Sequence, residues 1–125
     1  MKKKLLFTLL LVAATMQSIA QDTFHAVSLT YGTWITSIEK YRWEEIIAVD
    51  IPVTIKGNVI SIYSQELQVF RTLDDGVDLD AYTVQWYAID IEGRNCNVRL
   101  TILDDNIFLS VSYSDVCYYY RIESY

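Results

Sequence analysis

Apolar and polar residues alternate along residues 94–123, the most regular part of the chain. Alternation with a period of two is typical of β-strands that bury one face and expose the other. Two polar breaks divide this segment into three strands. The apolar residues of all three strands fall on one face: Cys96, Val98, Leu100, Ile102, Leu109, Val111, Tyr113, Val116, Tyr118 and Tyr120. The pattern therefore predicts a three-stranded antiparallel meander with one face in the core.

The two breaks also predict the strand register. Asp105 and Asn106 suit a two-residue turn because Asp and Asn tolerate a positive φ. Such a turn would place Leu100 opposite Val111, and a second turn at residues 114–115 would place Val111 opposite Tyr118. A slip of one residue would move a whole apolar set to the solvent side, so the register is well specified.

Residues 49–72 predict three more strands. The Gly-Asn dipeptide at residues 57–58 suits a hairpin turn that pairs Ile55 with Ile60. A further break at residues 64–65 would pair Ile62 with Leu67. This register also places Arg71 on the apolar face, where a charge would need a carboxylate partner, unless it lies at a barrel mouth or the register is wrong.

The remaining strands are less regular. Residues 24–34 predict a first strand, in which Gly32 marks a bend or bulge. Residues 36–45 predict a loop that leads into a strand near Trp43. Pro52 cannot donate to a strand ladder, so it should lie on an edge strand or beside a bulge. The apolar faces expected are Val27, Leu29 and Tyr31 in the first strand, and Tyr82, Val84, Trp86 and Ala88 in residues 82–88.

Two triplets of strands, each with one apolar face, cannot remain a flat sheet in water. We therefore expect an all-β fold, a small antiparallel up-and-down meander closed into a barrel or a highly curled sheet of about seven or eight short strands. A transmembrane barrel is the rival interpretation, but it needs at least eight strands of ~9–11 residues with a lipid-facing apolar band. Arg121 and Glu123 interrupt the final alternation and argue against it.

Residues 1–20 predict a secretory signal peptide. Three lysines precede an apolar run over residues 5–14, and the small residues Ser18 and Ala20 precede the expected cleavage point. Residues 21–125 would then form the mature protein, a single all-β domain located in the periplasm or outside the cell. The apolar run is too short to span a bilayer, so we expect no membrane insertion after cleavage; an uncleaved anchor is the alternative.

Charge narrows the choice of partners. Without the leader, seven basic and sixteen acidic residues remain, which is a net charge of −9. Such an acidic surface repels the phosphates of nucleic acids and anionic lipids. We therefore expect no nucleic-acid partner.

Export makes a disulfide between Cys96 and Cys117 chemically possible. In the predicted register, however, Cys96 faces the core and Cys117 faces the opposite side, with one strand between them. Two strand spacings exceed the ~7 Å between Cα atoms that a disulfide can bridge. We expect these two cysteines not to be bonded to each other.

An acidic loop over residues 73–81 is the sharpest local feature. Asp74, Asp75, Asp78 and Asp80 surround Gly76 and offer oxygen ligands of the kind that calcium prefers. Their spacing does not match the EF-hand loop. The alternative is a solvated turn whose charges keep strand edges from pairing with other chains.

Aromatic residues offer a candidate ligand or partner surface. Tyr119 faces opposite to Tyr118 and Tyr120, because successive residues of a strand alternate. With Tyr87 and Trp43 it would form exposed aromatic surface able to stack on a sugar or a peptide. The alternative is that these residues are present as good strand formers.

No catalytic, cofactor-binding or further metal-binding residue is expected. His25 has no Cys or His at ligand spacing, and the sequence contains neither a Gly-rich phosphate loop nor a nucleophile elbow. Adjacent carboxylates such as Glu44 and Glu45 would point to opposite faces of a strand.

The leader ending in SIAQ and the meander CNVRLTILDDNIFLSVSY resemble those of small exported bacterial all-β proteins of uncharacterised function. This resemblance implies a signal peptide and an all-β domain, and it supplies no active-site motif.

The interpretation favoured by the sequence is a non-catalytic, exported binding module for a small apolar ligand, a glycan or a protein. Lipocalin-like architecture would suggest an interior ligand, by analogy of fold. The alternative is a surface interaction or inhibitor module with a filled core, acting through the Pro52 strand or the tyrosine face. A hydrolase that uses loop carboxylates is the third candidate.

Overall fold

The structure is a computed structural model that describes residues 22–124. The predicted signal peptide, residues 1–20, lies outside the described residues. Within residues 22–124, no helix is long and apolar enough to cross a membrane.

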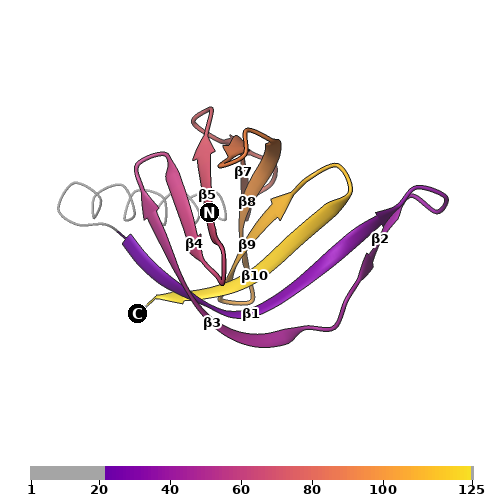
Figure 1. Cartoon of the computed structure of the whole chain (residues 1–125), viewed down its shortest axis with the longest axis horizontal. Coiled ribbons are helices and arrows are strands. Elements are labelled where there is room, and N and C mark those ends of the chain that lie inside the picture. Colours follow the sequence, from indigo (N-terminus) through magenta and orange to yellow (C-terminus); the bar gives the residue numbers. More distant parts are fainter. Residues whose placement is uncertain (1–21, 125) are drawn as a thin grey trace.

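The described chain is all-β and antiparallel, as expected. Eight strands close into a barrel in the order β1-β3-β4-β5-β7-β8-β9-β10, because β10 pairs with β1 (Figure 1). Strand β2 adds to the edge of β1, and the short β6 adds to β7. The bounds are β1 Asp22–Ile35, β2 Lys40–Trp43, β3 Ile47–Lys56, β4 Val59–Tyr63, β5 Leu67–Thr72, β6 Val77–Asp78, β7 Thr83–Asp90, β8 Asn95–Leu103, β9 Asn106–Ser112 and β10 Val116–Ser124.

The barrel interior is filled at its middle by the alternating apolar residues. Tyr120, Phe70 and Ile62 are among the largest side chains with almost no exposure, and they come from three different strands. The core face predicted for residues 94–123 is confirmed, since all of its β8 and β9 members but the partly buried Ile102 are fully buried. The buried core comprises Ala26, Val53, Ile60, Ile62, Phe70, Val84, Ala88, Cys96, Val98, Leu100, Leu109, Val111, Tyr120 and Ile122.

Strand β1 joins the two ends of the sheet. One edge pairs with β10 over residues 24–33, while the opposite edge pairs first with β3 and then, beyond Tyr31, with β2. The irregularity expected at Gly32 lies instead at Val27, where the register with both neighbours shifts. This bulge brings Phe24 and Ala26 to the core side with Leu29. The prediction that Val27 lies in the core is therefore wrong. The β1–β2 hairpin projects beyond the barrel (Figure 1).

Two of the predicted turns are confirmed. Ile55 pairs with Ile60 across residues 57–58, and Val111 pairs with Tyr118 across residues 114–115. The turn expected at Asp105 and Asn106 is displaced by one residue, to residues 104–105, so that Leu100 pairs with Leu109. Because this moves the register by two residues, every side chain keeps its predicted face.

The predicted register between β4 and β5 is wrong. Tyr63 pairs with Leu67 across a three-residue loop, so Ile60 pairs with Phe70 rather than with the residue before it. The shift of one residue exchanges the two faces of β5. Gln68 and Phe70 turn inward, and Arg71 is exposed rather than on the apolar face.

Strand β3 is an edge strand over half of its length. Residues 53–55 pair with both β1 and β4, whereas residues 47, 48, 51 and 52 pair with β1 alone. Pro52 therefore lies just beyond the last β4 pair and close to the register shift opposite Val27. Proline is confined to edge strands and bulges because it cannot donate to a strand ladder, and Pro52 lies beside both.

The cysteines lie as predicted, on opposite faces of the sheet with β9 between their strands. Cys96 is in the core, Cys117 is on the outer face, and neither is in a disulfide.

Candidate ligand-binding site

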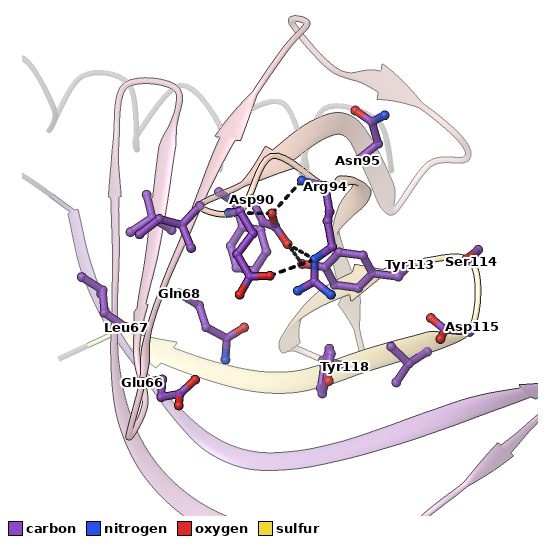
Figure 2. A pocket seen from close by; sticks show the side chains of 15 residues that line it. Glu66, Leu67, Gln68, Asp90, Arg94, Asn95, Tyr113, Ser114, Asp115 and Tyr118 are labelled. Carbon is purple, nitrogen blue, oxygen red and sulfur yellow. Dashed lines mark hydrogen bonds and ion pairs between the residues drawn. The ribbon is translucent and has the colours of Figure 1, made fainter.

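The barrel opens into a cup at the end where three loops meet. These loops are residues 64–66, 91–94 and 113–115. They lie at the same end because they follow β4, β7 and β9, which run in the same direction in the antiparallel sheet. The cup has a volume of about 760 Å³. Figure 2 shows the cup, which is lined by Glu66, Leu67, Gln68, Val69, Phe70, Asp90, Ile91, Glu92, Arg94, Asn95, Tyr113, Ser114, Asp115, Val116 and Tyr118.

A buried carboxylate organises one wall of the cup. Asp90 ends β7 with its side chain only 6% exposed. Its Oδ1 accepts hydrogen bonds from the backbone N–H groups of Glu92 (3.0 Å) and Arg94 (2.8 Å). Its Oδ2 accepts from the Arg94 Nε (3.0 Å) and from the Tyr113 hydroxyl (2.7 Å), as Figure 2 shows. One side chain thus fixes the β7–β8 loop and the start of the β9–β10 turn.

These contacts set the ionisation of the wall. Burial alone would raise the pKa of Asp90, but the hydrogen bonds from Arg94, Tyr113 and Glu92 outweigh it and hold that pKa below its ordinary value. Burial and the hydrogen bond to Asp90 raise the pKa of the Tyr113 hydroxyl. Burial and the nearby Asp90 charge raise the pKa of the Cys96 thiol to about 11. Asp90 is therefore ionised, and both of its carboxylate oxygens accept hydrogen bonds. This arrangement favours a structural role over proton transfer.

Arg94 completes the wall. Its guanidinium carbon lies 5.0 Å from the centre of the Tyr113 ring, a cation–π geometry. Its Nε also lies 3.7 Å from a Glu92 carboxylate oxygen. The Arg94 side chain remains 63% exposed and lines the cup.

The opposite wall combines an amide with apolar groups. The Gln68 Nε2 donates to the Ser64 Oγ at 3.2 Å, and Gln68 also forms a hydrogen bond with the buried Tyr120 hydroxyl. Phe70 closes the floor, and Leu67, which is 49% exposed, lies at the rim. The cup is therefore amphipathic, with an apolar floor and polar walls.

The lining is acidic. Four carboxylates, Glu66, Asp90, Glu92 and Asp115, and one guanidinium give it a net charge of −3. Asp90 and Arg94 neutralise each other at 3.0 Å, which leaves the other three carboxylates to set the potential at the mouth.

The structure brings together two of the three aromatic residues proposed as a ligand surface, and places them outside the barrel. The rings of Trp43 and Tyr119 lie 6.0 Å apart between centres. Tyr87 is 59% exposed on the outer side of β7, opposite Asn97 of β8, and does not line the groove that Trp43 and Tyr119 border.

The acidic loop does not gather its carboxylates. The Asp74 Oδ1 accepts from the backbone N–H of Gly76 at 3.0 Å, and the Asp80 Oδ1 accepts from that of Tyr82 at 2.7 Å. Both are side-chain caps of local turns. Within residues 22–124, no three His, Cys, Asp or Glu side chains converge to hold a metal ion.

Sequence reasoning missed the residues that organise the cup. The alternation of residues 82–88, continued by two positions, would have placed Asp90 on the inner face, where a carboxylate needs partners. Gln68 faces inward because the loop before β5 has three residues, whereas the sequence predicts two and so places Gln68 on the outer face.

Comparison with known proteins gives no match: no protein-family model, curated protein or solved structure matches this chain.

Proposed function

We propose that this protein is an exported, non-catalytic binding module that takes one small amphipathic molecule in the cup. The observation that carries the proposal is the cup itself, an opening of about 760 Å³ above a filled barrel core. Pockets for small molecules typically measure about 300–1,000 Å³ and combine apolar surface with a few placed polar groups. Export to the periplasm or beyond remains an expectation from the leader, tested by N-terminal sequencing of the secreted protein.

Charge indicates the class of ligand. With a net charge of −3 around the cup, an anionic head group would be repelled, whereas an uncharged or cationic one would not. The apolar part of the ligand would lie against Phe70, Val116 and Leu67, and its polar end near Gln68 and the Arg94–Asp90 wall. A purely apolar ligand fits this lining less well, because it would leave these polar groups without water.

Three probes with the same phenylalkyl body test this charge preference: 4-phenylbutylamine, 4-phenylbutanol and 4-phenylbutyrate. Titration followed by ¹H–¹⁵N NMR should shift the amides of residues 64–70, 90–95 and 113–118 with the amine and the alcohol, and weakly or not at all with the carboxylate. Failure of both the amine and the alcohol to shift these amides would contradict the proposal, and so would equal binding of the carboxylate.

Matched variants locate the site. Val116→Trp places an indole in the cup and should abolish the shifts. Val77→Trp is the control, because Val77 is 55% exposed on β6 and lies outside the cup. Circular dichroism would verify that both variants keep the β-fold.

A surface-interaction module is the second candidate, favoured by the exposed aromatic rings on the outer face. The hydrolase interpretation receives less support, since Asp74 and Asp80 of the acidic loop act as turn caps.

A further inference from the structure

A continuous row of aromatic rings runs over the outer face of the barrel. Consecutive ring centres lie 5.2, 5.4, 6.0 and 5.1 Å apart. The row crosses from the projecting hairpin onto the barrel wall. Its members are Trp34, Tyr41, Trp43, Tyr119 and Phe108. These rings lie outside the barrel core, and a contiguous row of aromatic rings on an outer surface is a candidate binding site.

Gly32 lets the row lie close to the sheet. A Cβ atom at this position would lie 2.9 Å from the Trp43 Cε3 atom, so only a residue without a side chain leaves room for the indole. Gly32 pairs with both Trp43 and Cys117, and the indole therefore covers the β1 backbone beside β10. Trp43 is nevertheless 48% exposed, so part of its ring is available to a partner.

A polar groove of about 540 Å³ lies beside these rings. Its floor is formed by outward-facing residues of β8, β9 and β10, which lie next to one another across the sheet. Tyr41 and Trp43 border it on the side of β2, and Leu79 and Asp80 border it on the side of β7. The floor includes Asn97, Arg99, Ser110, Ser112 and Tyr119.

The floor carries hydrogen-bonding groups that the protein does not fully use. The Asn97 Oδ1 atom is buried and has no hydrogen-bond partner among the described residues. The Arg99 Nε donates to the Gln85 Oε1 at 2.7 Å, which holds the guanidinium in place and leaves its two terminal nitrogens without an acceptor in residues 22–124. A buried polar atom without a partner, such as the Asn97 Oδ1, is unusual in a folded protein, and the exposed terminal nitrogens of Arg99 can donate to an acceptor that enters the groove.

Exposed aromatic faces beside amide, guanidinium and hydroxyl groups match the surface of a sugar. A pyranose ring presents C–H groups on its face, which the negative face of an aromatic ring attracts, and hydroxyl groups around its edge, which pair with donors and acceptors. Arg99 and Asp80 are the charged side chains that line the groove, and their charges balance, so an uncharged chain is favoured. We propose that this outer groove binds a neutral oligosaccharide, with Trp43 and Tyr119 stacking on sugar rings and Arg99 binding their hydroxyl groups.

Four neutral hexasaccharides serve as probes: cellohexaose, maltohexaose, xylohexaose and chitohexaose. Titration into the purified protein, followed by NMR and by tryptophan fluorescence, should show binding of at least one at the groove residues. Trp43→Ala and Tyr119→Ala should each weaken this binding about tenfold, the effect of one lost stacking contact. Tyr87→Ala is the matched control, since Tyr87 lies on the same outer face but not in the groove, and should change affinity less than twofold.

Thr101→Trp distinguishes loss of the binding site from damage to the fold. It fills the groove and removes none of the aromatic rings, so it should abolish saccharide binding while circular dichroism stays unchanged. Val116→Trp, which fills the cup, should leave saccharide binding intact, so the two sites can fail separately. Absence of binding by all four hexasaccharides overturns the proposal, as does binding that Trp43→Ala and Tyr119→Ala leave unchanged. The proposal is also overturned if the groove selects peptides from a displayed library and binds none of the saccharides.

Discussion

The Tyr113 hydroxyl donates a 2.7 Å hydrogen bond to the Asp90 carboxylate, 23 positions earlier in the chain. This contact joins the end of β9 to the end of β7, the two strands on either side of β8. Because the carboxylate also holds the backbone of the β7–β8 loop, this side of the rim is fixed by one buried anion.

We expect Tyr113→Phe to lower the free energy of unfolding by about 1–2 kcal/mol, since it removes one hydrogen bond to a charged acceptor. Urea denaturation measures the change. Tyr87→Phe removes the hydroxyl of a tyrosine that is 59% exposed and should have almost no effect. Equal losses in the two variants would show that the bond to Asp90 contributes nothing to the fold.

The ionisation of Asp90 predicts an acid dependence. Its pKa in the folded protein lies below the value of about 3.9 expected in the unfolded chain. The stabilisation from this group is therefore present above about pH 4 and is lost as pH falls through the lower, folded-state pKa. Asp90→Asn cannot ionise, so the difference in unfolding free energy between wild type and variant should be largest above about pH 4 and shrink towards pH 2.

Urea denaturation at a series of pH values measures this difference. Asp75→Asn is the control, because Asp75 is an exposed carboxylate of the acidic loop. A difference for Asp90→Asn that stays constant, or that grows on acidification, would contradict the assignment.

The indole of Trp43 occupies the space that a side chain at position 32 would need. Gly32→Ala should therefore displace the indole and destabilise the protein by about 1–3 kcal/mol, the usual cost of overpacking. In a Trp43→Ala background the same substitution should cost much less, because the obstructing ring is gone. Unfolding measurements on the two single variants and the double variant test this coupling. Additive losses would mean that the glycine is required for another reason.

The sequence predicted the alternation of the C-terminal meander and the closure of the sheet because burial of one apolar face requires both. It could not predict which residues of β5 face the cup. Gln68 and Phe70 turn inward only because the preceding loop has three residues rather than two, and a difference of one residue exchanges the faces of a strand. The bulge at Val27 likewise has no sequence signature, yet it decides which β1 residues reach the core.

Long-range contacts account for the rest of what was missed. The sequence predicts Trp43 and Tyr119 as parts of one exposed aromatic surface but not their direct contact, which depends on β2 pairing with the far half of β1. Asp90 and Tyr113 are likewise joined only once the barrel has closed.

The hairpin between β8 and β9 offers a test of the register itself. Asp104 and Asp105 have φ values of 51° and 64°, a left-handed pair typical of a type I′ turn. Glycine adopts this conformation without the strain that a Cβ atom causes, so Asp105→Gly should raise the unfolding free energy by about 0.5–1 kcal/mol. Asn106→Gly should instead lower it by a similar amount, because Asn106 pairs with Leu103 as the first residue of β9. Thermal and urea denaturation of the two variants measure these opposite effects. The reverse pattern, with stabilisation at position 106, would return the turn to residues 105–106 and move the pairing of β8 with β9 by two residues.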